Sequence, residues 1–145
     1  AMMSDFAGKI LITKSFACDS RSKLTMEPHR GVPLRNPIVG RYAMGSETER
    51  PQLFITISAI RDWCAEQGLQ FNAVRRDLLK EGVALTRHAY ADKNTGSVRI
   101  GISRGVADVP YLGQPICLEL DVGRAYGALE KMIPENNVIA ISSAG

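Results

Sequence analysis

The chain has 145 residues, of which 45% are hydrophobic and 23% are charged, and its formal net charge is +3. This length and composition suit one ordinary domain that can bury a core without disulfides or a structural metal. No apolar run approaches the length that spans a bilayer, so we expect a soluble protein with no membrane partner. The three cysteines are far apart and form no C-x-x-C pair, which favours a reducing, cytoplasmic setting.

Positive charge is concentrated in the first two thirds of the chain. Residues 1–50 and residues 51–104 each carry eight Lys or Arg against five Asp or Glu, whereas residues 105–145 carry two against five. We expect a single domain over residues 1–145. Its parts are an N-terminal strand and basic arm containing Pro and Gly (residues 1–37), a core (residues 38–123) and a C-terminal helix and tail (residues 124–145).

The first predicted elements are short strands. Residues 9–16 are rich in β-formers, and the prolines and glycine of residues 21–36 exclude a useful helix after them. Residues 39–44 and residues 53–56 are two further strand candidates, joined by a polar turn. We expect these two strands to pair as a hairpin.

Two compact helices are predicted next, over residues 58–67 and residues 72–81. Ser58 and Asn72 are good N-caps, and Gly68 and Gly82 supply the left-handed residues that end the helices. In the first helix, an apolar stripe of Ile60, Trp63, Cys64 and Gln67 faces the core and Arg61 faces water; in the second, the stripe is Val74, Leu78 and Leu79.

A β-hairpin is predicted after the helices. Residues 83–90 and residues 97–102 are strand-like, and the turn between them contains Asn and Gly. Residues 116–122 alternate in polarity, which predicts a strand with one buried face and with Glu119 and Asp121 on an exposed face. Residues 124–133 form a predicted helix. The order predicts an α+β fold: a winged helix-turn-helix-like domain with an additional N-terminal β region.

Cations on the second helix and on the hairpin suggest that the partner is DNA. Guanidinium and ammonium groups neutralise phosphate, and the start of a recognition helix can reach base edges. The candidate contacts are Asn72, Arg75, Arg76, Lys80, Arg87, Lys93 and Arg99, and His88 is a further candidate on the hairpin. The alternative is a solvated helix face, because Asp77 and Glu81 lie between the cations and can pair with them.

The basic arm is a weaker candidate for the same role. Its cations, spaced among prolines and glycines, could follow a phosphate backbone, but an ordinary surface loop explains them better. They are Lys14, Arg21, Lys23, His29, Arg30, Arg35 and Arg41.

The sequence offers little for catalysis, so we expect neither an enzyme nor a cofactor. Cys64 lies on an apolar stripe and Cys117 on an alternating strand, which predicts two buried thiols. A small hydrolase that uses Cys18 or His88 is a minor alternative, because no base, orienting group and oxyanion donor can be named together. The two histidines lie in no metal-binding motif.

Three stretches carry a resemblance to a known group of proteins. They are Val-Gly-Arg-Tyr at residues 39–42, the two predicted helices between residues 57 and 83, and Cys-Leu-Glu-Leu-Asp at residues 117–121. Together they resemble the C-terminal winged tails of primase- and helicase-like proteins carried by plasmids, prophages and integrative elements. The resemblance implies DNA contact within a replication or transfer machine, with a helicase or primase as a partner.

A protein-interaction module is the alternative from a different class. In that case Trp63, Phe71 or the edge of the hairpin would dock a partner or a second copy, and the basic face would be incidental. The sequence leaves the oligomeric state open.

Overall fold

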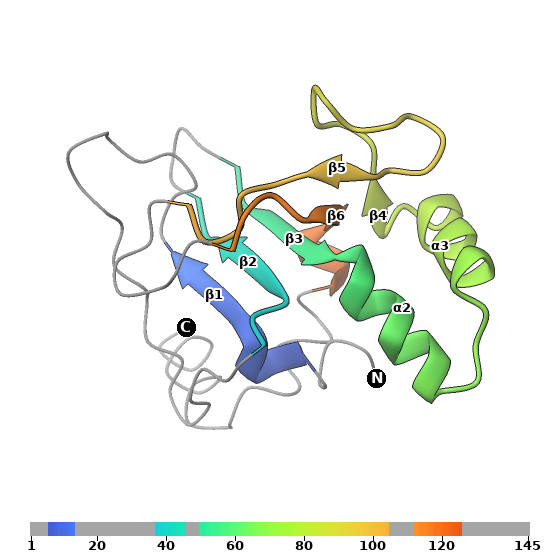
Figure 1. The fold of residues 1–145 in the computed structure, drawn as a ribbon. Coiled ribbons are helices and arrows are strands. Elements are labelled where there is room, and N and C mark those ends of the chain that lie inside the picture. The colour runs from blue at the N-terminus through green and yellow to red at the C-terminus, as the bar shows by residue number, and fades with distance from the viewer. Residues whose placement is uncertain (1–5, 14–36, 46–49, 105–111, 126–145) are drawn as a thin grey trace, which may run out of the picture.

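We analysed a computed structural model, which describes residues 6–13, 37–45, 50–104 and 112–125. Three helices with both ends described and six strands lie in these ranges (Figure 1). The helices are η1 (Ala7–Lys9), α2 (Ile57–Glu66) and α3 (Phe71–Lys80). The strands are β1 (Ile10–Thr13), β2 (Gly40–Ala43), β3 (Gln52–Thr56), β4 (Ala84–Leu85), β5 (Val98–Arg99) and β6 (Ile116–Leu120). In this part of the chain, no helix is long and apolar enough to cross a membrane.

All six strands belong to one mixed sheet, so the α+β class is confirmed. The order is β1-β2-β3-β6-β4, with β5 also paired to β6. β1 runs parallel to β2, and the remaining pairs are antiparallel. The expected hairpin of the second and third strands is present, with Arg41 opposite Phe54. The N-terminal β region is therefore an edge of the same sheet.

The predicted wing has a different arrangement. β4 and β5 do not pair with each other but lie one after the other along the same edge of β6. Leu85 lies opposite Glu119, and Val98 lies opposite Cys117. In a hairpin, β4 and β5 would be partners of each other. Here β6 is the partner of both, and its backbone groups form the hydrogen bonds that the two short strands need. The prediction of a closed hairpin was wrong, and residues 86–97 form a loop.

The ends of α2 and α3 follow the predicted glycine stops. At the end of α2, the amide of Leu69 donates to the Cys64 carbonyl over 2.8 Å, and Gly68 has φ +72°. α3 ends in the same way at Gly82, with the amide of Val83 bonded to the carbonyl of Leu78. Both bonds satisfy carbonyls that the last helical turn leaves without a partner.

Each predicted N-cap was wrong by two residues. Thr56, not Ser58, caps α2, and its hydroxyl accepts the amide of Ala59 over 3.3 Å. α3 begins at Phe71 after Gln70, which gives no side-chain cap. Asn72 therefore lies inside the first turn of α3, and its side chain is available for other contacts.

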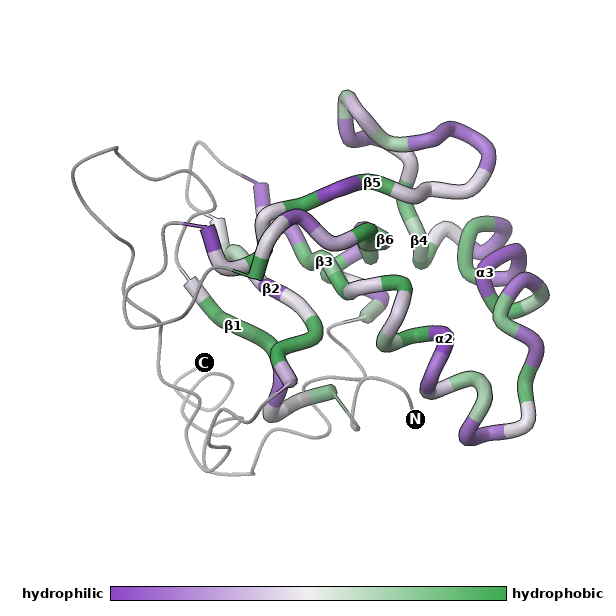
Figure 2. The backbone as a smooth tube through the Cα atoms, viewed as in Figure 1, coloured by the Kyte–Doolittle hydropathy of each residue, from purple (hydrophilic) through white to green (hydrophobic). Residues whose placement is uncertain are grey.

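Apolar side chains cover both faces of the sheet. On one face, Ile60, Cys64 and Phe71 of the two helices pack against Leu53 and Leu118. On the other face, a second cluster joins Phe54 and Cys117 to the segment around β5: Ala91, Val98, Ile100 and Ile102. Gln67, which we expected on the buried stripe of α2, is exposed. Figure 2 shows hydrophobic stretches along the strands, whereas much of α3 and of the loop before β5 is hydrophilic.

Several predictions lie outside the described residues. These are the end of the first strand beyond Thr13, most of the basic arm with Cys18 and His29, and the C-terminal helix beyond Ala125. Residues 122–125 are helical, which agrees with the start of the helix predicted over residues 124–133.

Candidate nucleic-acid interface

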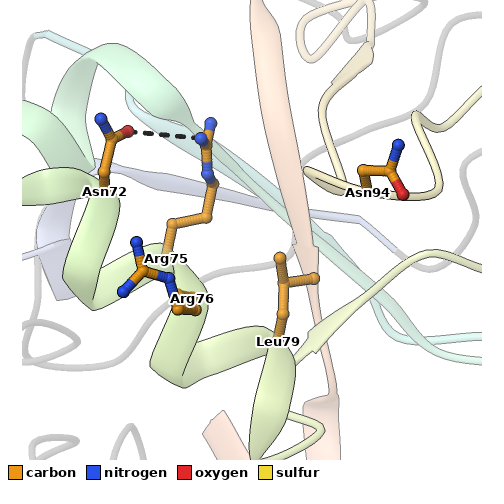
Figure 3. Close-up of a pocket in the computed structure, with 5 residues that line it drawn as sticks. All are labelled: Asn72, Arg75, Arg76, Leu79 and Asn94. Atoms are coloured by element: carbon orange, nitrogen blue, oxygen red, sulfur yellow. Dashed lines mark hydrogen bonds between the residues drawn. The ribbon is translucent and has the colours of Figure 1, made fainter.

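The first part of the candidate site lies between α3 and the loop that follows β4. Figure 3 shows four residues along α3 and, across from the helix, Asn94 on that loop. The depression between them has a volume of about 300 Å³, and its lining residues are Asn72, Arg75, Arg76, Leu79 and Asn94. The Arg75 guanidinium donates to the Asn72 side-chain oxygen over 3.3 Å. Three of the seven predicted contact residues therefore lie together.

A second depression adjoins the first at Arg75. Its volume is about 350 Å³, and it lies between the start of α2 and the start of β6. Arg61 of α2 also lines it, and the guanidinium carbons of Arg61 and Arg75 lie 4.9 Å and 5.1 Å from the ring centroid of Phe71. The buried ring thus attracts one cation from each of the two helices by cation–π interaction.

A third depression continues past Ser97 and Ile116, which line both it and the second one. It has a volume of about 510 Å³ and includes Tyr90 and Arg99. The Arg99 guanidinium is exposed and donates to the Gln114 carbonyl over 3.3 Å. We call the three adjoining depressions the arginine groove.

The charge of the arginine groove is of one sign. Its lining includes four guanidinium groups, those of Arg61, Arg75, Arg76 and Arg99, and none of the described residues that line it is Asp or Glu. One acidic residue that the charge of Arg75 reaches is Asp92, in the loop before β5. The pKa of Asp92 is lowered by hydrogen bonds from the amides of Thr95 and Asn94, with a smaller contribution from the charge of Arg75.

The acids of α3 do not neutralise its cations by close pairing. In the described part of the chain, no carboxylate lies within 4.0 Å of Arg76 or Lys80, and Asp77 and Glu81 are exposed beside them. Close salt bridges to Asp77 and Glu81 are therefore absent among the described residues, and the exposed cations Arg76 and Lys80 are solvated. Lys80 is exposed in the last turn of α3, outside the lining of the groove.

Arg87 has a structural partner rather than a place in the groove. Its Nε and Nη2 atoms both donate to one oxygen of Glu119, over 2.9 Å and 2.6 Å. Glu119 is only 1% exposed, so the predicted exposed face of this strand was wrong. Both faces of β6 are buried because distant segments cover them, which the local alternation did not reveal.

Lys93 also makes internal contacts. Its ammonium group donates to the carbonyls of Thr86 and His88, over 2.7 Å and 3.2 Å. These bonds tie the two ends of the turn together, and an Asp92 carboxylate oxygen accepts the amides of Asn94 and Thr95. Lys93 thus shapes the loop that carries Asn94 to the groove.

Arg41, one of the cations of the predicted basic arm, is completely buried. Its guanidinium donates to the hydroxyl of Thr13 and to the carbonyls of Ile102 and Arg104, the last over 2.8 Å. These bonds join β2 to β1 and to the chain after β5. A phosphate contact by Arg41 is excluded by its burial.

The described cysteines are poor nucleophiles. Cys64 and Cys117 are buried, as predicted, and burial raises the pKa of both thiols, that of Cys117 to about 12. A thiol with such a pKa carries almost no thiolate near neutral pH. Among the described residues, no group of three or more His, Cys, Asp or Glu side chains could hold a metal ion.

Sequence reasoning missed several groove residues. Arg61 was assigned to the solvent face of the first helix, and Tyr90 to the end of a strand. Their shared place in the groove depends on the packing of α2 against α3 and on the path of the loop, which no local pattern encodes. One signal was available: Arg61 is the last cation before Phe71 in the sequence, and Arg75 is the first after it.

No protein-family model, curated protein or solved structure matches this chain.

Proposed function

We propose that this protein binds DNA, mainly through phosphate contacts along the arginine groove. The observation that carries the proposal is the set of four guanidinium groups from two helices and one strand, with no described carboxylate among the lining residues. A groove of one charge sign concentrates counterions of the opposite sign, and a polyanion gains entropy when it replaces them.

The chemistry of the groove suits phosphate. A guanidinium group presents its N–H donors as a planar fork that matches two phosphate oxygens. The ring of Phe71 restricts Arg61 and Arg75, so less conformational entropy is lost when they bind. Arg76 is exposed, and no hydrogen bond or ion pair to the described residues is recorded for it.

The start of α3 adds a further favourable feature. Asn72 lies in the first helical turn, where backbone amides without partners give a partial positive charge. Its side-chain oxygen accepts from Arg75, so its amide nitrogen is free to donate to a phosphate or a base. The proposed contact set is therefore Asn72, Arg61, Arg75, Arg76 and Arg99, and Lys80 lies outside it.

The biological setting follows from the resemblance of this sequence to the winged tails. In that setting the protein would hold DNA for a replication or transfer machine whose helicase or primase supplies the motor. The described helix pair and its positive groove support DNA contact, and the setting is part of the proposal.

Fluorescence anisotropy with a labelled 20-nucleotide DNA at low salt tests the proposal. The Arg75→Ala/Arg76→Ala variant removes two groove charges, and we expect it to lose most of the affinity. Arg50→Ala/Lys80→Ala is the matched control: it also removes two exposed charges, and neither residue lines the groove. We expect the control to bind nearly as tightly as the wild type.

Two results would contradict the proposal. One is no binding by the wild-type protein at low salt, and the other is equal loss of affinity in both variants. Light scattering on the same samples shows whether a second copy covers α3. A stable dimer whose formation is abolished by the Arg75→Ala/Arg76→Ala variant would favour the protein-interaction alternative instead.

A further inference from the structure

Three rings contact one another in a row that runs from the core of the protein to its surface. The ring of Phe54, 1% exposed, meets the His88 ring edge to face, with centroids 6.1 Å apart at 81°. The His88 ring in turn lies 5.9 Å from the ring of Tyr90, which is 86% exposed. The row of rings thus ends in an aromatic side chain that is largely exposed to solvent.

The backbone of Tyr90 is held in place from within the loop. Its amide donates to the Nδ1 atom of His88 over 3.1 Å, which makes that nitrogen the acceptor of the imidazole. The amide of Ala91 and the ammonium group of Lys93 both donate to the His88 carbonyl. An exposed ring on such a fixed segment loses little conformational freedom when a ligand stacks on it.

Tyr90 lines the widest of the three depressions of the arginine groove. Arg99 and Gln114 line the same depression, together with Ile116, which is 41% exposed. Its volume of about 510 Å³ lies within the usual range of ligand sites. The Tyr90 ring offers a flat apolar surface beside the guanidinium group of Arg99. This arrangement suits a nucleotide whose base lies on the ring and whose phosphate contacts the arginine.

We propose that Tyr90 is a stacking platform for an unpaired base, so that the arginine groove prefers single-stranded DNA to duplex. This inference rests on the proposed function, because the groove must first hold the phosphates. In a duplex, both faces of each internal base are covered by neighbouring base pairs. An unpaired base can leave its neighbours and stack on a protein ring, whatever its identity.

Anisotropy titrations with three ligands test this inference: a single-stranded 20-nucleotide DNA, the duplex of the same sequence, and an abasic strand of the same length. We expect the wild type to bind the single strand on the order of tenfold more tightly than the duplex, the size of one stacking contact. Tyr90→Ala should lose that factor on the single strand only. Tyr90→Phe keeps the ring and should retain it.

The abasic strand separates stacking from charge. It carries the phosphates without bases, so the wild type and Tyr90→Ala should bind it equally. Because Tyr90 is largely exposed, we expect Tyr90→Ala to keep its fold, which circular dichroism checks.

The possible failures are distinguishable. Unchanged single-strand affinity in Tyr90→Ala, or equal binding of single strand and duplex by the wild type, overturns the stacking inference and leaves the proposed function intact. Unchanged affinity in Arg75→Ala/Arg76→Ala overturns the proposed function itself, whatever Tyr90 does.

Discussion

Arg87 donates two hydrogen bonds to a single carboxylate oxygen of Glu119, a residue that is 1% exposed. The second oxygen of Glu119 is buried and has no hydrogen-bond partner among the described residues. The charge of this carboxylate is therefore balanced chiefly through Arg87. The pair joins the chain after β4 to β6, and a further bond from Arg87 reaches the carbonyl of Pro51.

Arg87→Ala should destabilise the protein by about 3 kcal/mol, because it leaves a buried carboxylate unpaired. This value is the lower end of the usual cost of removing one partner from a buried ion pair. The Arg87 side chain is 36% exposed, so water can enter the space that it leaves and solvate Glu119 in part. Denaturant unfolding measures the loss. The double variant Arg87→Met/Glu119→Gln removes both charges and should recover most of the stability; an equal loss in the double variant would show that the ion pair is not the cause.

The Cys117 thiol should make stability depend on pH in alkaline solution. Burial raises the pKa of this thiol from its ordinary value of 9.0 to about 12 in the folded protein. Between these two values the unfolded chain has lost the proton and the folded chain has kept it, so folding becomes less favourable as the pH rises. The contribution is fully present below pH 9 and is lost at about 1.4 kcal/mol per pH unit up to about pH 12.

Unfolding of the wild type and of Cys117→Ala at several pH values between 9 and 11 tests this. Other groups titrate in the same range, so the informative quantity is the difference between the two proteins. We expect that difference to change steadily with pH in favour of the variant. A difference that stays constant across the range would contradict the raised pKa.

Gly40→Ala should destabilise the sheet by about 3 kcal/mol, the cost of overpacking at a site that cannot relax. A Cβ atom on Gly40 would lie 2.7 Å from Cδ1 of Ile55 and closer still to the backbone oxygen of Phe54. Gly68→Ala is the control. No atom lies within 4 Å of its Cβ position, so only the left-handed backbone opposes it, by about 1 kcal/mol.

Unfolding midpoints of the two glycine variants compare these costs directly. If Gly40→Ala proved as mild as Gly68→Ala, the register between β2 and β3 would be in error.

Replacing the groove arginines by lysine separates charge from geometry. Arg75→Lys/Arg76→Lys keeps both positive charges but removes the planar forks that match phosphate oxygens. We expect weaker DNA binding with an unchanged dependence on salt, because the number of neutralised phosphates stays the same. Anisotropy titrations provide both values. Affinity equal to that of the wild type would mean that the groove acts by charge alone.

The sequence predicted the features that short stretches of chain determine. Both helices, and the glycines that end them, follow from apolar spacing and from the left-handed backbone at Gly68 and Gly82. The pairing of β2 with β3 was also predictable, because a polar turn separates two adjacent strands.

Features that depend on distant segments were not predictable in this way. β6 pairs with three strands at once, and this single arrangement buries Glu119, separates β4 from β5 and turns a predicted wing into a loop. The burial of Arg41 has the same origin, because its acceptors lie on β1 and after β5.

The candidate site was only partly predictable, because some of its residues come together only through the packing of distant segments. Asn72, Arg75 and Arg76 come from one helix and could be found together, whereas Arg61 and Tyr90 reach the groove through tertiary packing. The charges of Arg87 and Lys93 predicted DNA contacts, but both charged groups make contacts within the protein: Arg87 with Glu119, and Lys93 with two backbone carbonyls.

The salt dependence of single-stranded DNA binding tests the central claim most directly. Four phosphate contacts by the groove arginines predict a slope of about −3 for the logarithm of the association constant against the logarithm of salt concentration. Arg75→Ala/Arg76→Ala should reduce the steepness by about 1.4, and Arg50→Ala/Lys80→Ala should leave it nearly unchanged. A slope near zero in the wild type, or the same slope in the wild type and the groove variant, would contradict the account.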